Sequence, residues 1–151
     1  DRRGRKSVLH NGLALAHLLG EIQHIIDTAR CTEELSIHAD ALQDAVGLLK
    51  RVLAHLKTVA ETEGVDAYMA DATVFLEFFG IITIAWQWLL QAQRAIECSA
   101  GVRKKSAQRF YAGKQHTCDY FFKYELPKVL ALSRILMDTT RPTLKAAPDE
   151  L

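Results

Sequence analysis

The stretch FLEFFGIITIAWQWLL, residues 75–90, is apolar on nearly every face of the helix that its length predicts. A helix of this kind belongs in the middle of an assembly of helices. The longest uncharged run, Phe78 to Gln93, is sixteen residues long and contains three glutamines, whereas a membrane span needs about 20 mostly apolar residues. We therefore predict a buried central helix from about Asp66 to Ser99, and no membrane span.

The segments before this helix carry two further helical patterns. In one of them, apolar residues recur at alternating spacings of four and three, which places them on one stripe of a helix; they are Leu35, Ala39, Leu42, Val46, Leu49, Leu53, Leu56 and Ala60. This helix is predicted to run from Thr32, an N-cap residue, to Gly64, a C′ residue. A similar stripe, from Leu15 to Ala29, predicts a first helix from about Ser7 to Arg30.

The segments after the central helix predict a fourth helix and a shorter piece. Gly101 ends the central helix, and the fourth helix is predicted from about Val102 to Glu125. Pro127 is expected to kink or restart it, because proline lacks the backbone N–H, and a short helix or continuation follows to about Asp138. The expected fold is all-α, an antiparallel up-down-up-down four-helix bundle with a Pro-kinked last helix. We place the bundle at residues 1–138 and a disordered tail at 139–151.

Composition limits the classes of function. The 151 residues include 19 Lys and Arg against 18 Asp and Glu, so a formal charge of +1 gives no global positive field for nucleic acid. Cys31, Cys98 and Cys118 have no C-x-x-C spacing, which favours free thiols and a reducing compartment. No secretory signal is visible, and we expect a cytoplasmic protein. Because the chain begins at Asp1 within an amphipathic pattern, we also expect it to be a piece of a longer protein.

The histidines do not predict a metal site. His10, His17 and His24 recur every seven residues, about 10.5 Å apart along a helix, so they cannot share one ion. Glu21 and His24 match the Glu-x-x-His pattern of di-iron bundles, but such bundles need two of these motifs and further glutamates. We predict no bound metal.

Neither nucleophilic catalysis nor phosphate binding has a motif here. The chain contains no Gly-x-Ser-x-Gly element and no glycine-rich phosphate loop. The basic runs Arg2–Lys6 and Arg103–Lys105 are more typical of solvated helix ends than of phosphate sites.

Two charged residues fall where the pattern expects apolar ones, Glu77 on the central helix and Lys114 on the fourth. A buried charge must be paired or shift its pKa. Antiparallel packing places position 114 near Trp88, and near Gln23 of the first helix. We therefore predict Lys114 paired with Glu21, and Glu77 with Tyr124 or Lys128, in structural rather than catalytic roles.

Two long stretches resemble a known domain. DAYMADATVFLEFFGIITIAWQWLLQAQR (Asp66–Arg94) and FYAGKQHTCDYFFKYELP (Phe110–Pro127) resemble the C-terminal domain of a bacterial group of long acyl-CoA dehydrogenases. GRKSVLHNGLAL (Gly4–Leu15) is similar to the lead-in of that domain. The resemblance covers most of the chain to Asp138, and it rests on helix-packing positions rather than on a catalytic signature.

The resemblance implies a parent enzyme of fatty acid metabolism that uses FAD to oxidise an acyl-CoA thioester at its α,β carbons. The glutamate base and the flavin-binding domain of such an enzyme precede this region, so we assign no catalytic and no cofactor-binding residue here, and Glu77 is not the base. The implied role is an auxiliary bundle that packs on the dehydrogenase core or on a second subunit of a homo-oligomer. An exposed apolar face is then expected on the chain alone.

Two alternatives come from other classes of protein. One is a free-standing helical interaction module, and the other is a four-helix carrier of a metal or ligand.

Overall fold

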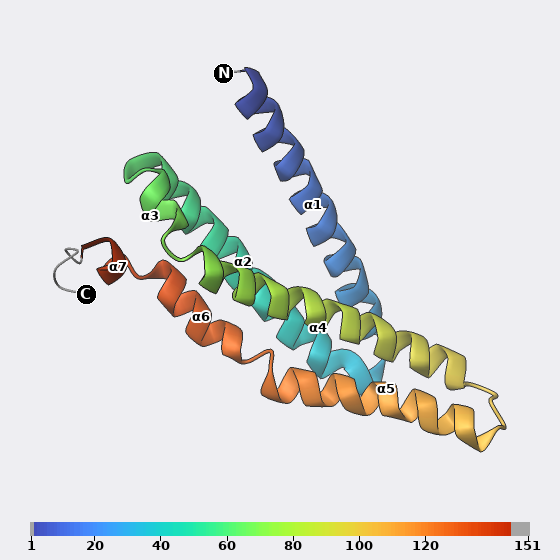
Figure 1. Ribbon diagram of the computed structural model, residues 1–151. Coiled ribbons are helices and arrows are strands. Elements are labelled where there is room, and N and C mark those ends of the chain that lie inside the picture. The colour runs from blue at the N-terminus through green and yellow to red at the C-terminus, as the bar shows by residue number, and fades with distance from the viewer. Residues whose placement is uncertain (1, 146–151) are drawn as a thin grey trace.

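The chain folds entirely into helices over the residues that the structure describes (Figure 1). The computed structural model describes residues 2–145, with side chains over residues 12–142 and at residue 144. The helices are α1 (Arg2–Arg30), a 3-10 turn η1 (Glu33–Leu35), α2 (Ser36–Thr62), α3 (Val65–Met69), α4 (Ala72–Ser99), α5 (Lys105–Tyr124), α6 (Lys128–Met137) and α7 (Pro142–Lys145). The all-α prediction is confirmed over residues 2–145.

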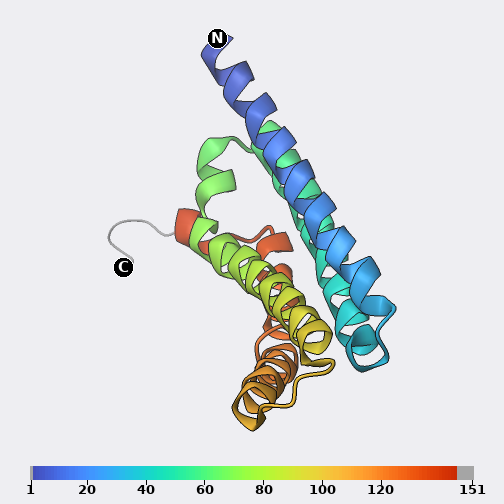
Figure 2. The ribbon, with the colours of Figure 1, turned by 90° about the vertical axis from the view of Figure 1, so that its right-hand side faces the viewer.

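Two helical hairpins and one bridging helix make up the arrangement. α1 packs along α2, α4 packs along α5, and α6 lies against both α2 and α4. In both ribbon views α5 lies on the far side of α4 from α1, and the free end of the α4–α5 hairpin reaches past the turn between α1 and α2 (Figures 1 and 2). A square four-helix bundle would make the first and fourth helices neighbours, so this finer part of the fold prediction is not confirmed.

The core forms where the apolar stripes of the helices meet. Fully buried side chains include Ile22 and Ile26 of α1, Leu42 and Leu49 of α2, Phe78, Ile82 and Leu89 of α4, and Cys118 of α5. Burying each large apolar side chain contributes about 1.5–3 kcal/mol. The stripes predicted from spacing are therefore the surfaces that hold the hairpins together.

Glycines with positive φ mark two of the turns. Gly64, at φ +93°, separates α2 from α3, and Gly101, at φ +81°, lies between α4 and α5. The central helix does not begin at Asp66 as predicted. A turn at Ala70 and Asp71 separates α3 from α4. α5 ends at Tyr124, and Pro127 is the residue before α6.

Part of the chain after α6 packs on the fold, although it was predicted to be a disordered tail. The Arg141 side chain is 6% exposed and forms an ion pair with Glu63 at the end of α2. Residues 142–145 then form α7. The predicted tail at 139–151 therefore includes a packed part, while its residues 146–151 lie outside the described part of the chain.

Candidate functional site

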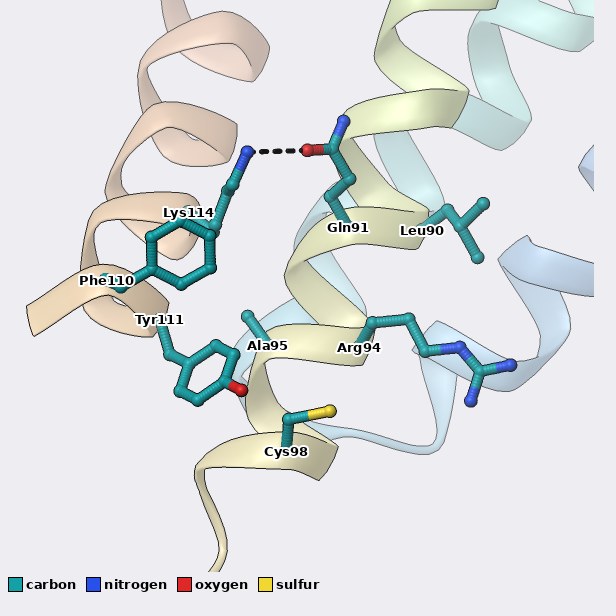
Figure 3. Close-up of a pocket in the computed structure, with 8 residues that line it drawn as sticks. All are labelled: Leu90, Gln91, Arg94, Ala95, Cys98, Phe110, Tyr111 and Lys114. Atoms are coloured by element: carbon teal, nitrogen blue, oxygen red, sulfur yellow. Dashed lines mark hydrogen bonds between the residues drawn. The ribbon is translucent and has the colours of Figure 1, made fainter. Parts of the chain in front are cut away.

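Lys114 is the half-buried cation at the seam between α4 and α5. Its Nζ donates a hydrogen bond of 2.9 Å to Oε1 of Gln91, which projects from α4 (Figure 3). The seam follows from the tight turn at Gly101, which folds α5 back antiparallel to α4. An amide oxygen of α4 therefore solvates the ammonium in place of the carboxylate that the sequence predicted.

Two aromatic rings lie near the same ammonium. Nζ lies 5.4 Å from the centroid of the Trp88 ring and 5.6 Å from that of Phe110. A cation within about 6 Å of a ring centroid is attracted by the electrons of the ring face. The predicted level of Lys114 beside Trp88 is confirmed.

A pocket opens beside Lys114 and has a volume of about 410 Å³. Its walls are mainly apolar and come from both helices of the hairpin: Leu90, Gln91, Arg94, Ala95, Cys98, Phe110, Tyr111 and Lys114 (Figure 3). Arg94 forms an ion pair with Glu97 at 2.7 Å, so its charge is compensated locally. The Lys114 ammonium has no ion pair among the described side chains.

The chemistry available here is recognition of a negative charge. A lysine ammonium offers three donors and no acceptor, and Gln91 accepts one of them. A carboxylate or phosphate presented together with an apolar group would satisfy both the cation and the walls of the pocket.

Glu21 and Glu77 are exposed rather than buried. The predicted pairing of Lys114 with Glu21 is wrong, because α1 packs on α2 and α4 and not beside α5. Glu77 likewise forms no ion pair with a described residue.

Lys128, one of the partners predicted for Glu77, bonds instead to Glu125 at 2.6 Å. That hydrogen bond raises the pKa of Lys128, and the charges of Glu125 and then Glu77 add to the rise. The charge of Glu77 therefore acts on Lys128 at a distance, without direct pairing.

Sequence reasoning also missed a polar contact between α2 and α5. His38 Nε2 of α2 lies 2.6 Å from Asp119 Oδ1 of α5, and the His38 ring packs on Phe122 at 4.6 Å between centroids. Next to Asp119, the buried thiol of Cys118 has its pKa raised to about 12, first by burial and then by the Asp119 charge. The only sequence signal was a histidine at the edge of the α2 stripe, which is too weak to name a partner.

The predicted absence of a metal site stays a prediction. Glu21 and His24 both lie on the exposed side of α1. Over the part of the chain with described side chains, no three His, Cys, Asp or Glu residues converge as a set of ligands.

The charges along the chain are separated by segment. Residues 99–128 contain seven Lys and Arg against two Asp and Glu, net +5, although the whole chain is +1. Residues 21–71 contain four Lys and Arg against ten Asp and Glu, net −6. The segment that contains α5 is therefore basic, and residues 21–71 are acidic.

Comparisons with known proteins give a family match and a relative. Residues 18–147 match the family described as acetyl-CoA dehydrogenase C-terminal like. The chain is 31% identical over 143 residues to the broad-specificity linear acyl-CoA dehydrogenase FadE5 of Mycobacterium tuberculosis, a match that covers 89% of this chain. The chain spans 23% of the length of that relative.

Proposed function

This chain belongs to the acetyl-CoA dehydrogenase C-terminal-like family, and we propose that it is the auxiliary C-terminal helical domain of a longer, FAD-dependent acyl-CoA dehydrogenase. The single observation that carries the proposal is the family match over residues 18–147. The parent enzyme would oxidise an acyl-CoA thioester at its α,β carbons in the cytoplasm. This domain would supply a packing surface rather than reacting groups.

The described residues do not fit FAD themselves. Rossmann-type dinucleotide sites hold the pyrophosphate on a glycine-rich turn at a helix N-terminus. Here Gly64 and Gly101, the described glycines with positive φ, each stand alone in their turn. The hollow beside Lys114 is open to solvent, and its lining residues come from the two helices of one hairpin (Figure 3), so we assign no flavin chemistry to this chain.

Uneven burial of α4 supports the packing role. Its most apolar 18-residue window is long and apolar enough to cross a membrane, yet only 22% of that window is buried. A core helix of a complete soluble domain is mostly covered. Its exposed apolar side chains, Leu76 and Ile84, are what a domain that packs on a dehydrogenase core or a second subunit would present.

The test compares the complete gene product with this chain alone. We expect the complete protein to bind flavin and to reduce an electron-acceptor dye when acyl-CoA is added. The chain alone should do neither, because it carries neither the base nor a flavin site. Flavin absorbance or dye reduction by the chain alone, or their absence from the complete protein, would contradict the proposal.

The exposed face of α4 also suits a free-standing interaction module, which is the alternative. A complete reading frame without a dehydrogenase domain would support that alternative.

A further inference from the structure

α4 exposes large apolar side chains in addition to its buried stripe. Leu76 is 68% exposed and Ile84 is 48% exposed. Ile84 stands seven residues before Gln91, two turns of the helix, and so lies on the same side as the Lys114 seam. The exposed side of α2 carries Ile37, which is 72% exposed near the start of the helix, and after it mainly charged residues, among them Asp40, Asp44, Lys50 and Arg51. α4 thus exposes two large apolar side chains, Leu76 and Ile84, among exposed polar ones at Glu77, Gln87 and Arg94.

α5 exposes large aromatic side chains as well. Phe110, Tyr120 and Tyr124 are 61%, 55% and 52% exposed. Their positions fall within roughly 80° around the helix axis at 3.6 residues per turn. The Tyr120 and Tyr124 rings also contact each other at 4.8 Å between centroids. We call the surface formed by Leu76, Ile84, Phe110, Tyr120 and Tyr124, with Lys114 at the seam, the outer face.

Lys114 sets a requirement on whatever covers the outer face. Its ammonium has only Gln91 and two aromatic rings as partners among the described side chains, and water reaches the rest of it. Covering the face would remove that water, and a desolvated charge is costly unless a countercharge meets it. The surface that packs on the outer face must therefore carry a carboxylate or another anionic group.

The charge of the hairpin argues against a second copy in the same orientation. Residues 99–128 carry a net charge of +5, so two outer faces brought together would oppose like charges. Meanwhile the chain spans only 23% of the length of its relative, which leaves most of a dehydrogenase to supply a different surface.

We propose that the outer face docks on the remainder of the parent dehydrogenase, and that Lys114 receives a carboxylate from an otherwise apolar surface there. This inference rests on the proposed function and adds to it the contact surface and the charge pair.

Carbodiimide cross-linking of the complete protein tests the pair directly. The reagent joins a lysine amine to a carboxylate that contacts it, and peptide mapping then identifies both residues. We expect Lys114 to be joined to an Asp or Glu outside residues 1–151. Heavy and light protein, grown separately and mixed under conditions that exchange subunits before cross-linking, show whether a joined acid comes from the same chain or from another subunit.

Matched variants separate the charge from general packing. Lys114→Arg keeps the cation but cannot be cross-linked, so it should lose the product and leave hydroxyl-radical labelling of Tyr120 and Tyr124 unchanged. Lys114→Met should raise that labelling severalfold, because the docked face loosens. Lys50→Met, on the charged side of α2, should leave it unchanged.

Other outcomes overturn the inference. A cross-link from Lys114 to an acid within residues 1–151 of its own chain or of a second copy would do so, as would the absence of any Lys114 product. Protection of Tyr120 and Tyr124 only when anionic vesicles are added would identify a lipid surface instead. If the complete protein contains no dehydrogenase part, the proposed function itself fails, and sequencing the gene shows this separately.

Discussion

Cys118 is a buried thiol surrounded by the side chains that join α5 to the core. Only the thiolate reacts quickly with alkylating reagents, and the raised pKa of Cys118, about 12, leaves almost none at pH 8. Cys31 and Cys98 are exposed. We predict that iodoacetamide at pH 8 modifies Cys31 and Cys98 of the folded chain at least tenfold faster than Cys118, measured by mass spectrometry of the peptides. All three should react alike in denaturant, and comparable rates in the folded chain would contradict this placement.

Arg141 is the charged side chain that the described structure buries most deeply, and Glu63 is its countercharge. Glu63→Gln keeps the shape but leaves the guanidinium without an anion. Because the Glu63 side chain is itself 44% exposed, we predict a loss of about 1–2 kcal/mol, below the 3–5 kcal/mol typical of fully buried pairs. Urea unfolding measures it. Glu61→Gln, at an exposed position of the same helix, should stay within about 0.5 kcal/mol of the original, and equal values for both variants would show that the pair does not form.

The Lys114 site shows which residue-level details a sequence can supply. The position of Lys114 level with Trp88 could be predicted by counting residues from the turn along two antiparallel helices, because each residue of a helix rises by a fixed amount. The partner Glu21 did not follow, because it depends on which helices become neighbours. The ammonium instead contacts side chains of α4, the helix that precedes α5 in the chain and packs against it.

Among the helices, the turn at Gly64 has the most restrictive backbone. Its φ of +93° and ψ of 180° lie in a region that is essentially confined to glycine. A Cβ at this position would meet no atom within 4 Å, so any loss comes from the backbone and not from crowding. We predict that Gly64→Ala destabilises the fold by about 1–3 kcal/mol in urea unfolding.

Gly20→Ala is the matched control for that turn. Gly20 is helical, and an added Cβ there would also meet no atom within 4 Å. Alanine is favoured over glycine inside a helix, so a gain of about 0.5–1 kcal/mol is expected. A similar change in stability for both variants would contradict the conformation of the turn.

Helix positions were largely predictable because apolar spacing and the two glycines mark them. α2, α5 and α6 begin or end within a few residues of the predicted bounds. The break at Ala70 and Asp71 was missed, because residues 65–72 contain neither Gly nor Pro and the turn depends on packing of α3 against α2. The bridging position of α6 was missed for a similar reason, since a short helix after a break can pack on any exposed stripe.

For the molecule as a whole, the outer face predicts a measurable affinity for apolar dyes. Large exposed apolar patches bind such dyes, whereas single exposed apolar residues do not form a patch. We predict that the double change Leu76→Gln with Ile84→Gln lowers the fluorescence of bound 1-anilinonaphthalene-8-sulfonate at least twofold without changing helix content by circular dichroism.

Leu13→Gln is the control for this effect. Leu13 is 63% exposed, but the next positions along its side of α1 are the exposed His17 and Gly20. Its replacement should leave the fluorescence unchanged. An equal drop in both variants would show that the dye reports general surface rather than the outer face.

The pairing of each helix with its neighbour in the chain also bears on how the molecule assembles. α1 with α2 and α4 with α5 are contacts between segments close in sequence, which gives the fold a low contact order. Helical proteins of low contact order fold in roughly microseconds to milliseconds, because little loop entropy is lost before contacts form. The two hairpins can therefore form early and independently. The late steps are those that join distant segments, namely the docking of α6 between them and the closure of Arg141 on Glu63.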